Sequence, residues 1–328
     1  MNSESPIAAP RSLVTAAFLT VYLVWGSTYL AIKLGVGTIP PGLLAGTRFF
    51  VAGALMYSFL RLRGAPRPAA RDWKHAGIIG TALLAGGNGG VTWAEQYVPS
   101  SVAALMIATA PAWFALGEWA RPGGKRPTLL TAAGIAVGFA GVALLLRPGG
   151  LVGPGSLPGI VALVFACAAW ATGSIYSRHV PQPASPALGV AMQMIAGGTV
   201  MFGFAAATGE PGRFAWAQVS GESLAALAYL IVFGSWLGFT AYMWLLRAST
   251  PAKVSTYAFV NPVVAVLLGA LLGGEAITGR TLLATGVILA GVLVIMSPAL
   301  GLAPALARLA GGRRRGTDAA AGGAAAGR

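Results

Sequence analysis

Hydrophobic residues occur along this chain in ten long runs that are separated by short polar stretches. Each run holds roughly 20 residues, the length that an α-helix needs to cross about 30 Å of hydrocarbon. Lipid cannot satisfy the hydrogen bonds of an open backbone, and the alternating pattern of membrane barrel strands is absent. We therefore expect an all-α integral membrane protein whose ten transmembrane helices lie near residues 12–32, 39–60, 75–97, 99–119, 128–146, 157–177, 186–208, 223–246, 251–273 and 280–297.

The ten runs form two sets of five with matching landmarks about 150 positions apart. A mid-run tryptophan, a terminal cation and two prolines recur in the same order: Trp25, Lys33, Pro99 and Pro111 match Trp170, Arg178, Pro251 and Pro262. Because five is an odd number, the second set must insert upside down relative to the first. The pattern predicts two inverted repeats, at 12–147 and 157–297, between an N-terminal tail (1–11) and a basic, Gly/Ala-rich disordered tail (298–328).

Composition narrows the class of protein. Hydrophobic residues make up 56% of the chain and charged residues 9%, with a mean hydropathy of +0.74, which excludes a soluble domain. No loop is long enough to fold as a nucleotide-hydrolysing domain, and the phosphate-binding pattern of Gly, four residues and Gly-Lys-Ser/Thr is missing. Active transport by this chain would therefore use an existing gradient or exchange.

Lysines and arginines are distributed unevenly between the two sides of the predicted bundle. With the N-terminus in the cytoplasm, 17 of them lie in inner loops and tails and 4 in outer loops, while Arg48 lies within a span. The positive-inside rule then predicts a multi-pass protein of a bacterial inner membrane with both termini cytoplasmic. The net charge of +14 is explained by this orientation and by anionic lipid, so we expect the bilayer and not nucleic acid as the partner.

Few residues are suited to metal or redox chemistry. Cys167 is the single cysteine, and both His75 and His179 fall at predicted cytoplasmic edges of spans. We expect no metal site and no cofactor. An intramembrane enzyme would need a cluster of acids, histidines or a nucleophile at one depth, and the sequence offers none.

Charged residues inside the spans are the first candidates for a functional site. Arg48 lies about nine residues into the second run, where an isolated guanidinium costs several kcal/mol unless it faces protein, water or an anion. It is a candidate substrate anchor or a buried scaffold cation. Lys33 and Glu95 lie near the outer ends of the first and third runs, where they either form a gate pair or extend to the headgroups. Glu95 is also the candidate proton carrier.

Two interruptions of the helical pattern add further candidates. Asn88 lies between four glycines at 86–90, which permit close helix packing or local unwinding beside a polar cavity. Pro111 and Pro262 fall at matching places in the fourth and ninth runs, where a proline frees a carbonyl of the preceding turn. We expect a matched pair of interrupted helices, with these prolines as hinges and Asn261 beside the cavity.

Aromatic and hydroxyl side chains complete the expected cavity. The candidates are Trp25, Ser27, Tyr29, Trp170, Gln193 and Tyr257. Trp25 and Trp170 lie midway along equivalent spans, so we expect them to share the wall of one central pocket. A cavity of this kind, with few charges, suits amphipathic or zwitterionic small molecules.

At these residues the chain resembles the drug/metabolite transporter superfamily, in its ten-helix form with two EamA-type repeats. The matching segments are Val24-Trp25-Gly26-Ser27-Thr28-Tyr29, Pro40-Pro41, Ala45-Gly46, Arg48-Phe49, Gly87-Asn88-Gly89, Glu95, Val98-Pro99-Ser100, Tyr257-Ala258, Val260-Asn261-Pro262-Val263-Val264 and Gly273-Gly274-Glu275. They extend over nearly all ten runs. One departure is visible: Glu275 follows the ninth run, but Gly124-Lys125 follows the fourth, so a symmetric pair of glutamates is not supported.

The resemblance implies efflux of small metabolites or drugs across the plasma membrane by alternating access, driven by protons or by exchange. A channel and an anionic metabolite exchanger remain as alternatives, although anionic substrates favour more than one deep cation. The sequence leaves open the substrate, the coupling ion and the oligomeric state, a homodimer included.

Overall fold

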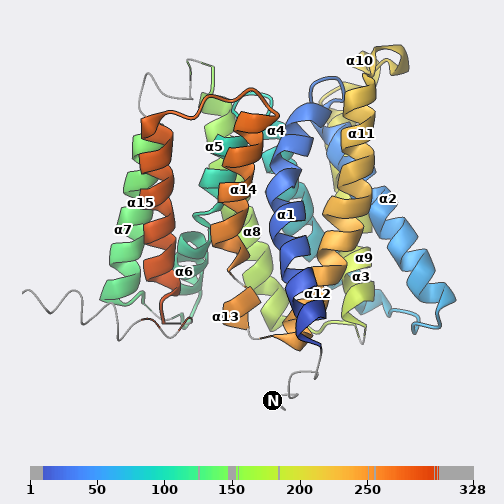
Figure 1. Ribbon diagram of the computed structural model, residues 1–328. Helices are drawn as coiled ribbons and strands as arrows, with labels where there is room; N and C mark the ends of the chain where they lie inside the picture. The colour runs from blue at the N-terminus through green and yellow to red at the C-terminus, as the bar shows by residue number, and fades with distance from the viewer. Residues whose placement is uncertain are drawn as a thin grey trace, which may run out of the picture.

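The computed structural model describes residues 10–302, apart from 125, 147–152, 154, 184, 250, 255, 299 and 301. Most of the two predicted tails and Lys125 therefore lie outside the described residues. All regular secondary structure in the described residues is helical, and these residues contain no strand. Its N-terminal end lies at the lower edge of the bundle (Figure 1).

The first repeat consists of α1 (Arg11–Gly35), α2 (Pro41–Leu62), α3 (Ala70–Gly80), the π-helix η1 (Thr81–Gly89), α4 (Gly90–Ala94), α5 (Ser100–Ile107), α6 (Ala110–Ala120) and α7 (Leu129–Leu145). The second repeat consists of α8 (Leu157–His179), α9 (Pro186–Ala207), α10 (Glu210–Arg213), the short 3₁₀-helix η2 (Trp216–Gln218), α11 (Gly221–Tyr229), the π-helix η3 (Leu230–Leu237), α12 (Gly238–Ala248), α13 (Pro251–Val254), α14 (Tyr257–Leu271) and α15 (Gly279–Met296).

These elements account for the ten expected spans. Seven helices among the described residues are long and apolar enough to cross a membrane. Two shorter apolar helices, α7 and α14, and the continuous stretch α3–η1–α4 supply the other three. The all-α fold of two five-helix repeats is therefore confirmed.

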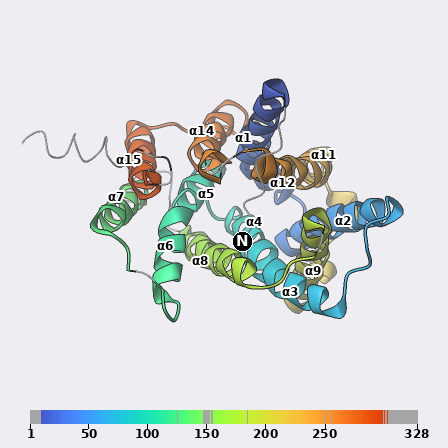
Figure 2. The ribbon, with the colours of Figure 1, turned by 90° about the horizontal axis from the view of Figure 1, so that it is seen from below.

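Helix packing follows the symmetry of two inverted repeats. Equivalent helices pack against each other in antiparallel pairs, α2 with α9 and α7 with α15, and these are the most extensive helix contacts (Figure 1). The remaining contacts come in matched sets: α1 packs on α14 as α8 packs on α6, and η1 packs on α8 as η3 packs on α1. Seen from the N-terminal end, the helices surround one centre, with α7 and α15 outside the ring (Figure 2).

Glycines allow the close approach of α2 and α9. A Cβ on Gly198 would lie 2.6 Å from the backbone nitrogen of Phe50, and one on Gly53 would lie 2.7 Å from the Cβ of Met194. Lipid supplies no hydrophobic drive for helix association, so close van der Waals contact between backbones stabilises such a pair. Gly53 of the first repeat and Gly198 of the second therefore lie in one interface.

The helix interruptions differ from the sequence expectation. The fourth span breaks at Ala108 and Thr109, with Pro111 in the first turn of α6. The ninth span breaks before Tyr257, and α14 continues through Pro262. Both matched spans are therefore interrupted, but the break in the ninth lies ahead of Pro262 and not at it, and Asn261 holds the turn around Pro262 against α1. Its amide nitrogen, oriented toward carbonyls, donates to Tyr22 O at 3.2 Å and Tyr257 O at 3.3 Å.

The two π-helices are a second matched pair of irregularities. η1 begins at Thr81 in the third span and η3 begins at Leu230 in the eighth, which is the equivalent span of the second repeat. A π-helix shifts the register of the backbone hydrogen bonds and frequently occurs at functional sites. Sequence patterns did not predict either one.

Candidate functional site

Arg48 is buried in the middle of α2, with 3% of its surface exposed. Its Nε donates a hydrogen bond of 3.0 Å to the hydroxyl of Ser235 in η3. Its guanidinium carbon lies 4.6 Å from the ring centroid of Phe49. Nη1 is buried and makes no hydrogen bond with any described residue. One part of the guanidinium is therefore fixed to the scaffold, and another part remains available for an anion.

Glu95 ends α4 and is completely buried. Both oxygens of its carboxylate lack a hydrogen-bond partner among the described residues. Lys33 does not pair with this carboxylate; its Nζ donates to the backbone oxygens of Glu95 at 2.6 Å and of Val98 at 3.2 Å. Neither expected arrangement, a Lys33–Glu95 side-chain pair or extension of Glu95 to the headgroups, is present, because the lysine caps the C-terminal end of α4.

Arg48 and Glu95 interact electrostatically, and Lys33 and Glu275 also act on the Glu95 carboxylate. The ion pair within 4.0 Å in the described part of the chain is Arg121–Glu118, at 3.4 Å, so Arg48 and Glu95 do not touch. A buried polar group without a partner carries a desolvation cost of about 1–3 kcal/mol, and more when it is charged. A buried cation and a buried acid with free hydrogen-bonding atoms are thus held near each other but apart.

Aromatic rings from α12 and α14 surround Trp25. Its ring centroid lies 5.2 Å from that of Phe239, 5.1 Å from that of Tyr242 and 5.4 Å from that of Tyr257. Its Nε1 donates to Gly234 O at 3.2 Å. The structure therefore brings together the predicted residues Trp25 and Tyr257, and the same contacts tie α1 to η3 next to Ser235.

Ser27, Tyr29 and Asn261 also belong to the region around α1. The hydroxyl of Ser27 lies 2.6 Å from that of Tyr229. Tyr29 is partly buried and interacts electrostatically with Glu95. Asn261 is buried, and its amide is used in the contact between α14 and α1. Tyr29 is thus coupled to Glu95, Ser27 contacts Tyr229 at the end of α11, and Asn261 joins α14 to α1.

Three predicted site residues make no hydrogen bond with Arg48 or Glu95 in the described structure: Asn88, Trp170 and Gln193. The Nδ2 atom of Asn88 donates to Leu83 O at 3.4 Å within η1. A Cβ on Gly87 would lie 2.9 Å from the Trp170 ring, so the glycine segment serves close packing of η1 on α8. Gln193 is at the contact of α9 with Gly80 of α3. Among the described ring contacts, none joins Trp25 to Trp170.

Ser235 is a site residue that the sequence interpretation missed. It is completely buried in η3, and the adjacent Gly234 leaves room for the guanidinium, since a Cβ there would lie 3.2 Å from Arg48 Nη2. The one available signal was a Gly-Ser pair at 234–235 in an apolar run, similar to the pair at 26–27. That signal does not identify Arg48 as its partner.

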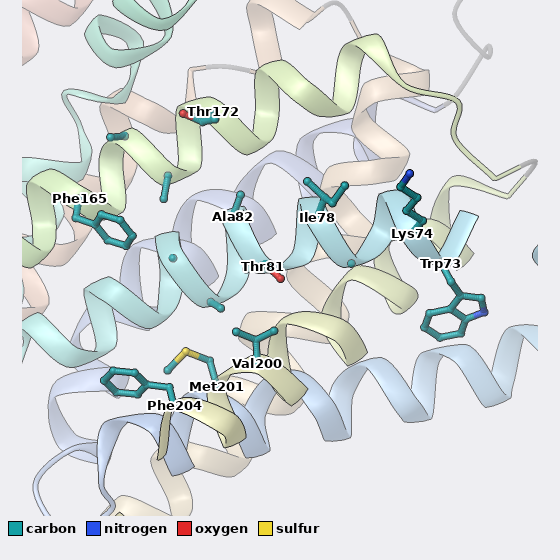
Figure 3. A pocket seen from close by; sticks show the side chains of 15 residues that line it. Trp73, Lys74, Ile78, Thr81, Ala82, Phe165, Thr172, Val200, Met201 and Phe204 are labelled. Atoms are coloured by element: carbon teal, nitrogen blue, oxygen red, sulfur yellow. The ribbon is translucent and has the colours of Figure 1, made fainter. Parts of the chain in front are cut away.

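A groove of about 910 Å³ lies elsewhere, along α3 and η1 between α8 and α9. Its lining includes Trp73, Phe165, Val200, Met201 and Phe204, and contains none of the predicted site residues (Figure 3). Phe165 is 62% exposed and Phe204 39%. This apolar groove is on the flank of the bundle, where acyl chains would cover it, so it is not our candidate site.

Comparison with known proteins assigns the family. The model of the EamA-like transporter family matches residues 13–147 and again residues 157–297. This chain belongs to the EamA-like transporter family. The two EamA matches together cover most of the chain and follow the two sets of helices seen in the fold.

Relatives of this EamA protein are named as transporters. An uncharacterized inner membrane transporter of Escherichia coli K12, YedA, is 41% identical over 85% of this chain and 89% of its own length. A probable amino-acid metabolite efflux pump of Salmonella typhimurium LT2 is 26% identical, over 84% of this chain and 92% of its own. A probable terminal-alkyne amino-acid exporter of Streptantibioticus cattleyicolor is 28% identical, over 88% and 94%.

A solved crystal structure supports the same fold for this EamA chain. It superposes with a TM-score of 0.61 at 24% identity, and covers 89% of this chain and 99% of its own. At this identity the match shows the fold alone. The family and the named relatives, by contrast, show that this protein is a multi-pass membrane transporter and not an enzyme.

Proposed function

We propose that this transporter exports zwitterionic, amino-acid-like molecules across the plasma membrane by alternating access. The observation that carries the proposal is the presence of two buried opposite charges, Arg48 and Glu95, each with polar atoms that have no hydrogen-bond partner among the described residues. Arg48 would bind the carboxylate of the substrate and Glu95 its ammonium group. The aromatic cluster around Trp25 would contact an apolar side chain.

The two charges favour a zwitterion over the other substrate classes. An anionic metabolite would leave Glu95 buried and unpaired, and a simple amine would leave Arg48 buried and unpaired. Either case would cost a few kcal/mol of binding free energy. A molecule with both charges compensates both residues at once. Two relatives with amino acids in their names, the Salmonella pump and the Streptantibioticus exporter, support this substrate class.

Glu95 would also couple transport to protons. A completely buried carboxylate binds either a proton or a substrate ammonium more readily than it stays charged and unpaired. Protons entering from outside would then displace the substrate outward, and substrate from the cytoplasm would displace the proton inward. The distribution of 17 inner and 4 outer cations supports cytoplasmic termini and hence this direction.

Transport into proteoliposomes tests the proposal. We would measure counterflow of a panel of amino acids, together with their amine and carboxylic acid analogues, with and without an imposed pH gradient. We expect saturable transport of zwitterions that grows with the gradient. Glu95→Gln should abolish the dependence on the gradient and retain at most a slow exchange.

Arg63→Ala is the matched control, because Arg63 follows the same helix as Arg48 but is exposed at its end. It should transport at the wild-type rate. Equal transport of the amine analogue and the zwitterion would refute the role of Arg48, and a gradient response that survives Glu95→Gln would refute the role of Glu95. Flux that does not saturate would favour a channel instead.

A further inference from the structure

Four glycines with positive φ mark equivalent helix ends in the two repeats. They are the residues with positive φ among those described: Gly64 (+86°), Gly123 (+75°), Gly209 (+70°) and Gly274 (+65°). They follow α2, α6, α9 and α14, the second and fourth spans of each repeat. Such a left-handed conformation favours glycine, so the same turn is built four times.

The residue after each glycine differs between the two ends of the bundle. At the end that holds the N-terminus, Gly64 and Gly123 are followed by Ala65 and Gly124. At the opposite end, Gly209 and Gly274 are followed by Glu210 and Glu275. A symmetric backbone scaffold therefore carries carboxylates at one end only.

Glu210 binds the first turn of α2, which belongs to the other repeat. Its side chain accepts hydrogen bonds from Gly42 N at 3.2 Å and Leu43 N at 3.0 Å. Glu210 is 4% exposed, and a Cβ on Gly42 would lie 2.8 Å from its Oε2. A carboxylate at a helix N-terminus satisfies backbone donors and interacts favourably with the helix dipole.

Glu275 makes the equivalent contact with the first turn of α5. Its Oε1 accepts from Ser100 N at 2.6 Å and Ser100 Oγ at 2.7 Å. Its Oε2 accepts from Ser101 N at 3.0 Å and from the Ser101 hydroxyl. Four hydrogen bonds to one charged group thus join the end of the ninth span to the start of the fourth.

The other described acidic side chains make no such cross-repeat contact. Asp72 accepts from Ala69 N and Glu118 pairs with Arg121, each beside its own helix. Glu222 is exposed in the first turn of α11, and Glu95 is buried without a hydrogen-bond partner. Within the part of the chain that the structure describes, carboxylates therefore tie the two repeats together only at the end opposite the N-terminus.

We propose that Glu210 and Glu275 are latches that hold the outer end of the transporter closed. The inference rests on the proposed alternating access and on the proposed cytoplasmic N-terminus. Opening toward the outside separates the repeats at this end and breaks the carboxylate contacts, so their strength sets the fraction of outward-open protein. At the same end, Lys33 joins α1 to the C-terminal end of α4, a contact within the first repeat.

Thiol labelling measures this fraction without any substrate. The chain has a single cysteine, the buried Cys167, so Cys167→Ala gives a cysteine-free background. In this background Ser27→Cys places a reporter near the middle of α1. A membrane-impermeant maleimide would be added to the outer or to the inner face of oriented membranes, and the two labelling rates compared.

We expect Glu210→Gln and Glu275→Gln to raise the outer rate and lower the inner rate, shifting their ratio about tenfold. Glu222→Gln, at the same end of the bundle, should leave both rates unchanged. A rise at both faces would mean that the glutamates only stabilise the fold, which would overturn the proposal. Unchanged or absent labelling in both variants would overturn it as well.

A variant at the opposite end of the bundle tests the latch proposal by adding a carboxylate contact instead of removing one. Ala65 follows the turn equivalent to that of Glu210 and packs against the cluster that contains Leu188. Leu188 is the third residue of α9, as Leu43 is of α2. Ala65→Glu should therefore bind the first turn of α9, latch the cytoplasmic end and also shift labelling toward the outer face.

The outcomes separate this proposal from the proposed substrate. If labelling shifts as expected but no zwitterion is transported, the latches stand and the substrate assignment fails. If zwitterions are transported and labelling does not shift, the transport function stands and the latches fail.

Discussion

Arg48 is the residue whose environment demands an explanation most strongly. Ser235 binds its Nε, and Nη1 is left buried without a partner among the described residues. Arg48→Ala should abolish transport, and Arg48→Lys should retain little, because an ammonium group cannot bind Ser235 and a substrate carboxylate in the same geometry. Counterflow in proteoliposomes measures both variants. Wild-type rates in variants that insert normally would show that Arg48 is neither an anchor nor essential to the scaffold.

We expect Ser235 to affect transport through its hydrogen bond to Arg48. Ser235→Ala removes the acceptor of the Nε hydrogen bond, which is worth about 1.5–3 kcal/mol for a charged donor. We expect KM for the transported amino acid to rise about tenfold while the maximal rate changes less, and Ser235→Thr to restore binding. Thr240→Ala is the control, since this exposed hydroxyl bonds Trp236 O of its own span. An equal loss in both alanine variants would contradict the positioning role.

Among the elements, the α2–α9 pair depends on backbone contact. The Cβ of Gly198→Ala would lie 2.6 Å from Phe50 N, so the helices must separate, at a cost of about 1–3 kcal/mol. Gly203 lies on the same helix with nothing within 4 Å of an added Cβ. Thermal unfolding in detergent should show a lower Tm for Gly198→Ala and no change for Gly203→Ala. Equal Tm values would mean that the interface adapts without cost.

Helix breaks were less predictable than helices. A proline in a hydrophobic run indicates a weakened turn, and Pro111 does follow a break. In the ninth span the break lies further ahead of the proline, before Tyr257, and Asn261 joins the turn around Pro262 to α1. Neither π-helix contains a proline; the glycines around Asn88 in η1 allowed local unwinding but did not distinguish it from close packing. Their register depends on the helices packed against them, so the sequence of one span does not reveal them.

For the whole molecule, ten spans would place both termini on one side of the membrane, and the cation distribution predicts that this side is the cytoplasm. A phosphatase that is active only outside the cytoplasm would report this orientation. Fused after Gly37 it should be active, and fused after Gly64, at the opposite end of α2, it should be inactive. The reverse pattern would contradict the orientation, the direction of transport and the assignment of the latches to the outer end.

The ten spans, the two inverted repeats and the family can be predicted from the sequence, and Arg48, Glu95 and Trp25 stand out in it as candidates for the site. These features depend on local composition and on patterns that recur along the chain. Only the tertiary structure decided that Ser235 holds Arg48, that Lys33 binds backbone carbonyls rather than the Glu95 carboxylate, and that Glu210 and Glu275 join the repeats at one end. Ser235 and Arg48 are 187 positions apart in the sequence, Glu275 and Ser100 are 175 apart, and Glu210 and Leu43 are 167 apart. These contacts depend on how each helix is rotated and placed in the bundle, which no single stretch of sequence specifies.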